Sequence, residues 1–176
     1  MMRIAAVSLF ITFVTLGLPT AHSGDISVGD LIIERPWARA TMKIAEFGVG
    51  YINIINIGPN PDRLKSATTE ISERVEIHNM TLTNAGMQQR LVADGLELGA
   101  RSVTDLKPGG THLRFVGLKR PLRKEHSFNV RLDFEKAGPV DVLFLTTEIG
   151  GKSPYPDAIN DVSGSASGSR SRGGNN

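Results

Sequence analysis

The sequence predicts an all-β domain, built as an immunoglobulin-like Greek-key β-sandwich of about seven or more strands. Residues 74–80 and 128–134 alternate polar and apolar side chains, which is typical of half-buried antiparallel strands. Turns rich in glycine and proline recur at intervals of roughly 10 residues, as they do in a sandwich or barrel. No stretch carries an apolar stripe with helical spacing beyond about one turn.

Five strands are marked most clearly by their composition. The first is rich in β-branched and aromatic residues and ends at the turn sequence GPNP at 58–61. The fourth alternates throughout and ends at KAGP at 136–139. In chain order, the expected strands cover residues 51–57, 74–80, 111–117, 128–134 and 140–147.

The two ends of the chain differ in composition from its middle. Residues 1–23 have a basic start, an apolar run and small residues before a predicted cleavage site after Ser23, as in a secretory signal peptide. The apolar run of about 15 residues is shorter than the roughly 20 of a spanning helix, so an uncleaved anchor is the less favoured alternative. Residues 24–149 form the predicted domain, and the Gly/Ser/Arg-rich residues 150–176 form a predicted flexible tail. We therefore expect an exported protein with no membrane span after cleavage.

Charge and cysteine content exclude several classes of function. The 176 residues include 20 Lys and Arg against 18 Asp and Glu, and this net charge of +2 is too small to predict nucleic-acid binding. There are no cysteines, which excludes disulfides, thiolate metal sites and a cysteine nucleophile. Neither G-x-S-x-G nor H-E-x-x-H is present, so we expect no enzyme. A monomer is expected.

Two histidines and two methionines form a candidate metal site. His78 and Met80 lie two positions apart in one expected strand and therefore face the same side. Met87 follows the predicted hairpin turn at 83–86, and His112 begins another strand. Thioether sulfur suits Cu(I), and imidazole suits copper among several metals. The alternative is that the methionines fill gaps in the core while the histidines lie on the surface. Met42 is expected to be a packing residue.

Several segments, taken together, resemble the PCu(A)C family of periplasmic copper chaperones. The resemblance covers most of residues 26–147. It rests on RPWARA at 35–40, GVGYINI at 48–54, RVEIHNM at 74–80, LKPGGTH at 106–112, GLKRPL at 117–122 and FEKAG at 134–138. The resemblance implies a cupredoxin-like β-sandwich that binds Cu(I), with Cu(II) as a second state. It also implies delivery of copper to the Cu(A) centre of cytochrome c oxidase, or to another periplasmic copper protein.

The chain departs from the family pattern at two expected ligands. His78, Met80 and His112 match family positions, but Gln89 stands where a methionine is expected eleven positions after His78. Arg114 stands where the methionine of the H-x-M motif is expected. A cation about 7 Å from Cu(I), at an effective dielectric constant near 20, costs roughly 2 kcal/mol of binding free energy.

These departures leave two functions open. The first is a copper chaperone whose weakened or rearranged site uses His78, Met80, Met87 and His112. The second is a copper-free periplasmic binding module that retains the sandwich and uses Arg114 to hold a protein or a small anion.

Overall fold

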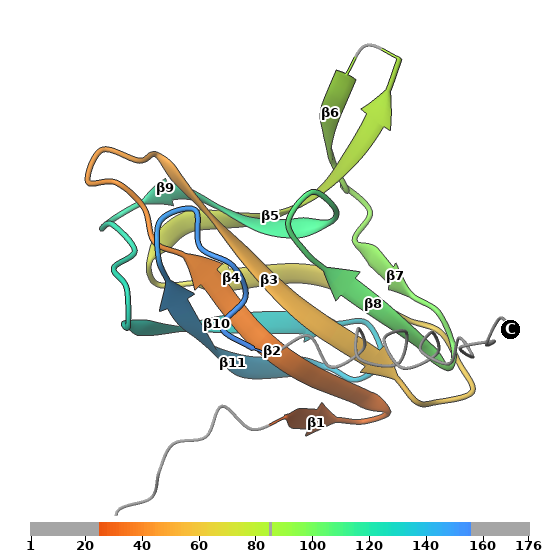
Figure 1. The fold of residues 1–176 in the computed structure, drawn as a ribbon. Coiled ribbons are helices and arrows are strands. Elements are labelled where there is room, and N and C mark those ends of the chain that lie inside the picture. Colours follow the sequence, from red (N-terminus) through yellow and green to blue (C-terminus); the bar gives the residue numbers. More distant parts are fainter. Residues whose placement is uncertain (1–24, 85, 156–176) are drawn as a thin grey trace, which may run out of the picture.

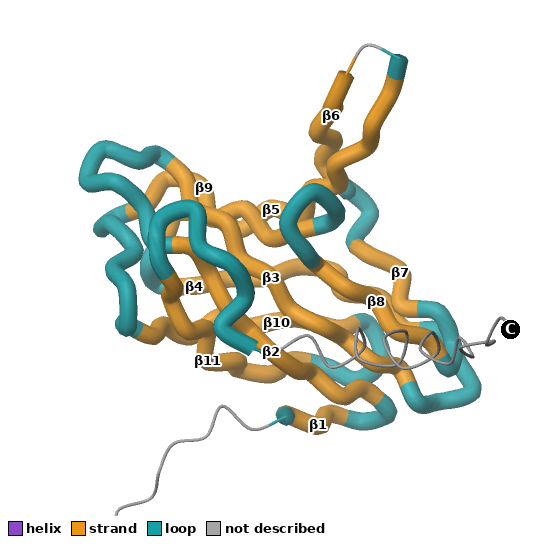
Figure 2. The backbone as a smooth tube through the Cα atoms, viewed as in Figure 1, coloured by secondary structure: helices purple, strands orange, loops and turns teal. Residues whose placement is uncertain are grey.

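The computed structural model describes residues 25–84 and 86–155, and this part of the chain consists of strands joined by loops (Figures 1 and 2). The signal peptide predicted at 1–23 lies outside the described residues. Among them, no helix is long and apolar enough to cross a membrane. The strands are β1 Ile26–Val28, β2 Leu31–Arg39, β3 Phe47–Asn56, β4 Asp62–Thr69, β5 Ser72–Thr83, β6 Gly86–Leu91, β7 Leu96–Leu98, β8 Ser102–Leu106, β9 His112–Leu118, β10 Ser127–Phe134 and β11 Pro139–Thr147.

The five expected strands correspond to β3, β5, β9, β10 and β11, so the all-β prediction is confirmed. Hydrogen bonds connect the strands in the order β6-β5-β9-β3-β2-β11-β10-β4-β7, with β1 added to β2 and β8 added to β3. The sheet is mixed rather than wholly antiparallel, because β2 and β11 run parallel, with Trp37 opposite Leu145. The alternation of side chains marks a strand but not its direction, and this parallel pair could not be read from the sequence.

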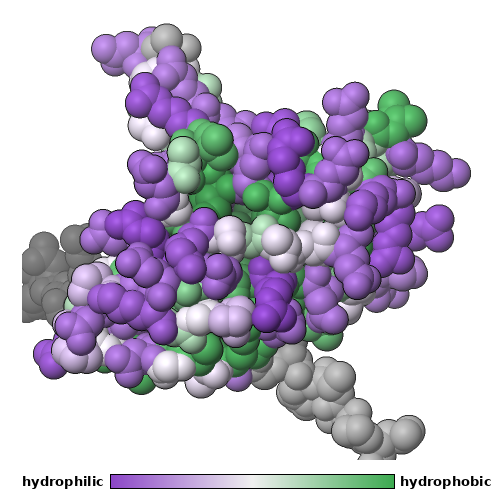
Figure 3. All heavy atoms as spheres, turned by 180° about the vertical axis from the view of Figure 1, so that it is seen from behind, coloured by the Kyte–Doolittle hydropathy of each residue, from purple (hydrophilic) through white to green (hydrophobic). Residues whose placement is uncertain are grey.

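The core lies where this sheet folds back on itself. Phe115 of β9 contacts Phe128 of β10 and Phe144 of β11 edge-on, with ring centroids 5.3 and 6.1 Å apart. The alternation expected in β10 is realised, because its buried side chains are every second residue: Phe128, Val130, Leu132 and Phe134. Seen from behind in Figure 3, the surface is mostly hydrophilic, with apolar side chains in smaller areas. Burial of the apolar side chains of the core is the main favourable term in the free energy of folding.

A glycine allows β3 to lie close to this core. Gly50 pairs with Leu113 of β9, and a Cβ atom at Gly50 would be 2.8 Å from the ring of Phe115. No side chain fits in that space without moving an aromatic ring. The absence of a side chain at Gly50 therefore allows β3 to pack closely against β9 at Leu113, the residue that follows His112.

The hairpin of β5 and β6 rises beyond the rest of the molecule (Figure 1). Thr83 pairs with Gly86 at its tip, which confirms the turn expected at 83–86. Gly86 has a φ of 101°, a conformation that glycine adopts readily. Leu82, Met87 and Leu91 of the hairpin are exposed. The hairpin thus carries apolar side chains outside the core.

The described chain continues past the predicted domain boundary at residue 149. The side chain of Arg39 donates a hydrogen bond from Nε to the carbonyl of Gly151, at 3.0 Å. The hydroxyl of Tyr155 donates to the carbonyl of Pro36, at 3.2 Å. The first residues of the predicted tail therefore contact β2, and residues 156–176 lie outside the described part of the chain.

Candidate metal centre

Two buried histidines lie opposite each other on neighbouring strands. His78 of β5 and His112 of β9 are register partners in the antiparallel pair. Their exposed fractions are 9% and 5%, and their ring centroids are 6.1 Å apart. Side chains of directly opposed residues extend from the same face of a sheet. The structure thus brings together the two histidines that are 34 positions apart in the sequence.

Hydrogen bonds fix the tautomer of His112. Its Nδ1 lies 2.9 Å from the carbonyl oxygen of Gly110, and a carbonyl can only accept, so Nδ1 carries the proton. The other nitrogen, Nε2, therefore holds a lone pair. The side-chain amide of Gln89 donates to it from Nε2 at 3.0 Å. In this arrangement Gln89 occupies the lone pair that His112 would offer to a metal ion.

His78 has the opposite tautomer. Its Nε2 lies 2.8 Å from Oε2 of Glu76, and an ionised carboxylate can only accept, so Nε2 carries the proton. In the neutral ring Nδ1 then holds the lone pair. This Nδ1 atom is buried and has no hydrogen-bond partner among the described residues. A buried polar atom without a partner is unusual, and this one is a metal-ligating atom.

Glu76 is held in its ionised form by its neighbours. The hydrogen bond from His78, followed by the one from Arg74 Nε at 2.7 Å, lowers the pKa of the Glu76 carboxyl group below its ordinary value. The carboxylate therefore remains a hydrogen-bond acceptor for His78 in mildly acidic solution. A carboxylate or backbone carbonyl behind the distal nitrogen is the usual support of a metal-ligating histidine. Glu76 provides this support for His78, and the carbonyl of Gly110 provides it for His112.

The pKa of His112 lies below its ordinary value of 6.5. Burial is the largest cause, because it disfavours the charged imidazolium. The hydrogen bond to Gly110 opposes this shift, whereas the charges of His78 and Arg114 add to it. His112 is therefore neutral, and able to offer a lone pair, at a lower pH than an exposed histidine.

The depressed pKa of His112 predicts a pH-dependent stability. As the pH falls below 6.5, the unfolded chain protonates this histidine while the folded protein does not, so the free energy of unfolding falls. The loss is at most about 1.4 kcal/mol per pH unit for one proton, and it ends once the folded state also takes up the proton. Urea unfolding between pH 7.5 and 5 measures it. In His112→Gln this part of the pH dependence should be absent, and an unchanged slope would contradict the assignment.

The methionines occupy the same face at increasing distance from the histidines. Met80 follows His78 by two residues, so it is the next side chain on that face. It pairs with Gln89 and is partly buried. Met87 pairs with Leu82, which is four residues beyond His78, or about 13 Å along an extended strand. Met87 is therefore diagonal to Met80, as expected from the turn, but it lies toward the exposed tip. The structure groups Met80 with the histidines and places Met87 further out.

Arg114 is tied to an aromatic ring. It lies two positions after His112 in β9, and its guanidinium carbon is 4.0 Å from the centroid of Phe47. This is a cation–π contact. Its Nε atom is buried without a hydrogen-bond partner among the described residues. The positive charge stays close enough to His112 to lower its pKa, as described above.

Some residues of this region were not predicted from the sequence. Glu76 is two positions before His78, so the alternation of the strand could have identified it. Tyr51, whose ring centroid is 6.5 Å from that of His112, has no comparable signal. The prediction that Met42 packs inside the protein is wrong, because this side chain is 64% exposed in the loop between β2 and β3.

Within residues 25–84 and 86–155, no three His, Cys, Asp or Glu side chains gather in a group that could hold a metal ion. A hydrolytic site needs three such protein ligands in most zinc enzymes. A metal bound at His78 and His112 would need a further ligand of another type, and Met80 is the neighbouring thioether.

Solved structures resemble this fold over most of its described length. The copper-bound PCuAC domain from PmoF2 has a TM-score of 0.61 and 26% identity, covering 71% of this chain and 98% of that domain. The apo PCuAC domain from PmoF1 gives the same TM-score and identity, with 71% and 99% covered. The Cu(I) form of DR1885 from Deinococcus radiodurans, at 24% identity and a TM-score of 0.53, covers 72% of this chain and 83% of that one, and shows the likeness of fold alone.

The sequence itself matches one family along most of the domain. A relative named "Putative lipoprotein Lxx21020", from Leifsonia xyli subsp. xyli, is 24% identical over 164 residues, which cover 92% of this chain and 89% of the relative. The family model described as "Putative lipoprotein LpqE-like" matches residues 31–145, from the start of β2 into β11. Because this match spans more than half of the chain, the protein belongs to the LpqE-like family, which is a PCuAC-like family.

Proposed function

We propose that this protein is an exported copper carrier that holds Cu(I) between His78 and His112, with Met80 as a supporting ligand. One observation carries the proposal. The two imidazoles are buried on paired strands, and in each ring an acceptor fixes the proton on one nitrogen and leaves a lone pair on the other. Export is supported by the lipoprotein names of the family and of the relative.

The state of the two rings suits copper binding physically. A histidine must be neutral to bind a metal, and the depressed pKa of His112 keeps its lone pair unprotonated at mildly acidic pH. The unpaired Nδ1 of His78 gains a partner when a metal binds. Two nitrogen donors with a nearby thioether favour Cu(I), and the imidazoles permit Cu(II) as a second state. Met87 lies further along the same face and is a candidate for transient contact during loading or release.

Two features make this site weaker than a site with the full set of methionines. The amide of Gln89 must leave Nε2 of His112 before a metal can bind there, which costs a hydrogen bond of about 0.5–1.5 kcal/mol. The guanidinium of Arg114 opposes any added positive charge near His112. Weak binding is compatible with a carrier, because a carrier must also release its cargo.

Delivery to a copper acceptor is the second part of the proposal. The acceptor is the Cu(A) subunit of cytochrome c oxidase or another exported copper protein. The exposed apolar residues Leu82, Met87 and Leu91 extend from the face that carries His78, and they offer a surface beside the metal for such a partner. No catalytic role is proposed, and neither nucleic acid nor a membrane is part of the proposal.

A copper-free binding module is the second candidate. The observation that favours it is the hydrogen bond between Gln89 and His112, because it satisfies in the protein the lone pair that a copper site would use. In such a module the imidazoles complete a polar network, and Arg114 leaves its contact with Phe47 to bind a partner.

An anaerobic competition titration with a chromogenic Cu(I) chelator separates the two candidates. We expect one equivalent of Cu(I) to bind with a Kd below about 1 μM. Mixing the copper-loaded protein with a purified Cu(A) domain then tests delivery. We expect Cu(I) to pass from the carrier to the Cu(A) domain without added chelator. Failure to compete for Cu(I) would favour the copper-free module. Tight binding without transfer would retain the carrier and exclude this acceptor.

A further inference from the structure

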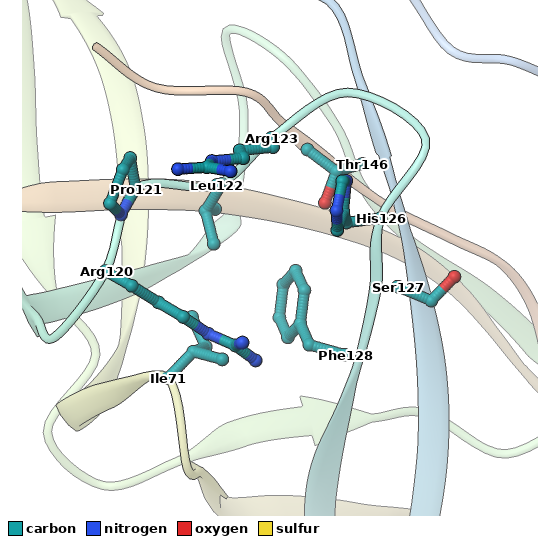
Figure 4. A pocket seen from close by; sticks show the side chains of 9 residues that line it. All are labelled: Ile71, Arg120, Pro121, Leu122, Arg123, His126, Ser127, Phe128 and Thr146. Atoms are coloured by element: carbon teal, nitrogen blue, oxygen red, sulfur yellow. The ribbon is translucent and has the colours of Figure 1, made fainter. Parts of the chain in front are cut away.

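A second candidate site lies at the opposite end of β5 and β9 from the histidines. It is a pocket of about 310 Å³ between the start of β5, the loop after β9 and the neighbouring ends of β10 and β11 (Figure 4). The pocket is lined by Ile71, Arg120, Pro121, Leu122, Arg123, His126, Ser127, Phe128 and Thr146. None of these residues belongs to the copper site proposed above.

Two cations at this pocket form no ion pair with the described part of the chain. Within the described residues, the guanidinium groups of Arg120 and Arg123 form neither an ion pair nor a hydrogen bond. The nearby acids Glu125 and Glu148 both pair with Lys124, at 3.8 and 2.7 Å. Figure 4 shows the side chain of Arg120 extending toward Phe128, with Arg123 beside Leu122. The two guanidinium groups, which line the pocket from different sides, are therefore free to bind an anion.

The floor of the pocket is apolar. Ile71, Leu122 and Phe128 line it and are 3%, 4% and 7% exposed, respectively. An apolar surface with a few polar groups at its edge is the usual composition of a small-molecule site. This floor suits the hydrocarbon part of a ligand rather than an inorganic anion.

A buried hydroxyl in the pocket wall also needs a partner. Thr146 is 2% exposed, and its Oγ1 atom has no hydrogen-bond partner among the residues that the structure describes. Figure 4 places Thr146 next to His126, on the side of the pocket across from Arg120. Buried hydroxyl groups are rarely left without a partner, and a bound acceptor would satisfy this one.

We propose that this pocket binds a small amphipathic carboxylate. Its carboxylate is held by Arg120 and Arg123, its hydrocarbon body lies over Phe128, and Thr146 supplies a further hydrogen bond. Arginine pairs with carboxylates through two parallel hydrogen bonds, which favours this anion over a single-point acceptor. A cavity of about 150 Å³ holds one benzene ring, so about 310 Å³ accommodates roughly a dozen non-hydrogen atoms.

The probe is 4-phenylbutyrate, and its matched control is 4-phenyl-1-butanol, which has the same hydrocarbon body without the charge. In an NMR titration of the protein, we expect the acid to shift the amide signals of residues 120, 122–128 and 146 with a Kd below about 1 mM. The alcohol should bind at least tenfold more weakly. No shift with 5 mM of 4-phenylbutyrate, octanoate or indole-3-acetate, or equal binding of the alcohol, would overturn the proposal.

Variants test the residues assigned to the ligand. The double substitution R120Q/R123Q should weaken binding of 4-phenylbutyrate at least tenfold, whereas the control R90Q/R101Q, with the same change in net charge outside the pocket, should leave it unchanged. Unchanged affinity in R120Q/R123Q would overturn the proposal. Thr146→Val should weaken binding at least threefold, and an unchanged Kd would overturn the geometry assigned to the hydroxyl. Cu(I) titration of R120Q/R123Q should match wild type, so the two proposals fail independently.

Discussion

Replacing both His78 and His112 by alanine is expected to abolish copper binding. These residues supply the two nitrogen donors of the proposed site, and the described chain offers no other cluster of acidic or histidine ligands to replace them. Met80 alone cannot hold Cu(I) against a chelator, because a single neutral thioether provides one weak ligand. In the anaerobic competition titration, the Kd should rise at least a thousandfold relative to wild type, beyond the range of the chelator.

The matched control for this experiment is His126→Ala. His126 is an exposed histidine in the loop before β10, so its loss removes one imidazole from the protein without touching the site. Both histidines at the site are buried, and alanine leaves space behind, so H78Q/H112Q serves as a second variant with a fuller side chain. The near-ultraviolet CD spectrum verifies that each variant is folded. Retention of one equivalent of Cu(I) in a folded H78Q/H112Q variant would contradict the assignment of both ligands.

Strand positions and the shared face of the site were predictable because they follow from local rules. Alternation alone marks β5 and β10, and it places Glu76, His78 and Met80 on one side of the sheet. The turn at 83–86 then returns β6 antiparallel, so the order of residues along the hairpin also follows. The resemblance to a copper-chaperone family indicated which of these residues to consider.

What the sequence does not contain is the register between strands and the direction of individual side chains. Direct opposition of His78 and His112 depends on how β5 and β9 align, although the two residues are 34 positions apart in the sequence. Met87 lies opposite Leu82, rather than beside the histidines, because the hairpin pairs Thr83 with Gly86 and this pairing sets the register of β6. The stacking of Arg114 on Phe47 depends on the rotamer of Arg114, and this rotamer is determined by contact with a ring on the neighbouring strand β3. Such details are fixed by tertiary packing rather than by local pattern.

Restoring the two family methionines is expected to strengthen copper binding at least a hundredfold. In Q89M/R114M, the amide that donates to His112 is absent, which removes a competing interaction of about 0.5–1.5 kcal/mol. Loss of the guanidinium removes a repulsion of roughly 2 kcal/mol from the bound cation. These two effects together are about 3 kcal/mol, or more than a factor of one hundred in Kd, before any new thioether bond is counted. The same titration measures the change.

A second measurement shows whether the charge of Arg114 acts as proposed. The positive charge of Arg114 lowers the pKa of His112, so Arg114→Met alone should raise that pKa, as followed by NMR titration of the imidazole signals. Methionine keeps an apolar contact with Phe47, which limits the loss of packing. If the pKa of His112 does not rise, the charge is screened from the site, and any gain in copper affinity would have to come from sulfur.

The control for the double change is Q88M/R90M, which makes the same substitutions on the opposite face of β6. Gln88 and Arg90 pair with Thr81 and Asn79, so methionines there point away from His78 and His112. This control adds two thioethers and removes one cation but should leave the Kd for Cu(I) at the wild-type value.

If the control tightens Cu(I) binding as much as Q89M/R114M does, the gain is a general effect of methionine content. If wild type already binds as tightly as Q89M/R114M, Gln89 and Arg114 do not weaken the site. If only Q89M/R114M binds, the native protein has given up copper, because a hydrogen bond and a cation now occupy the position of two soft ligands.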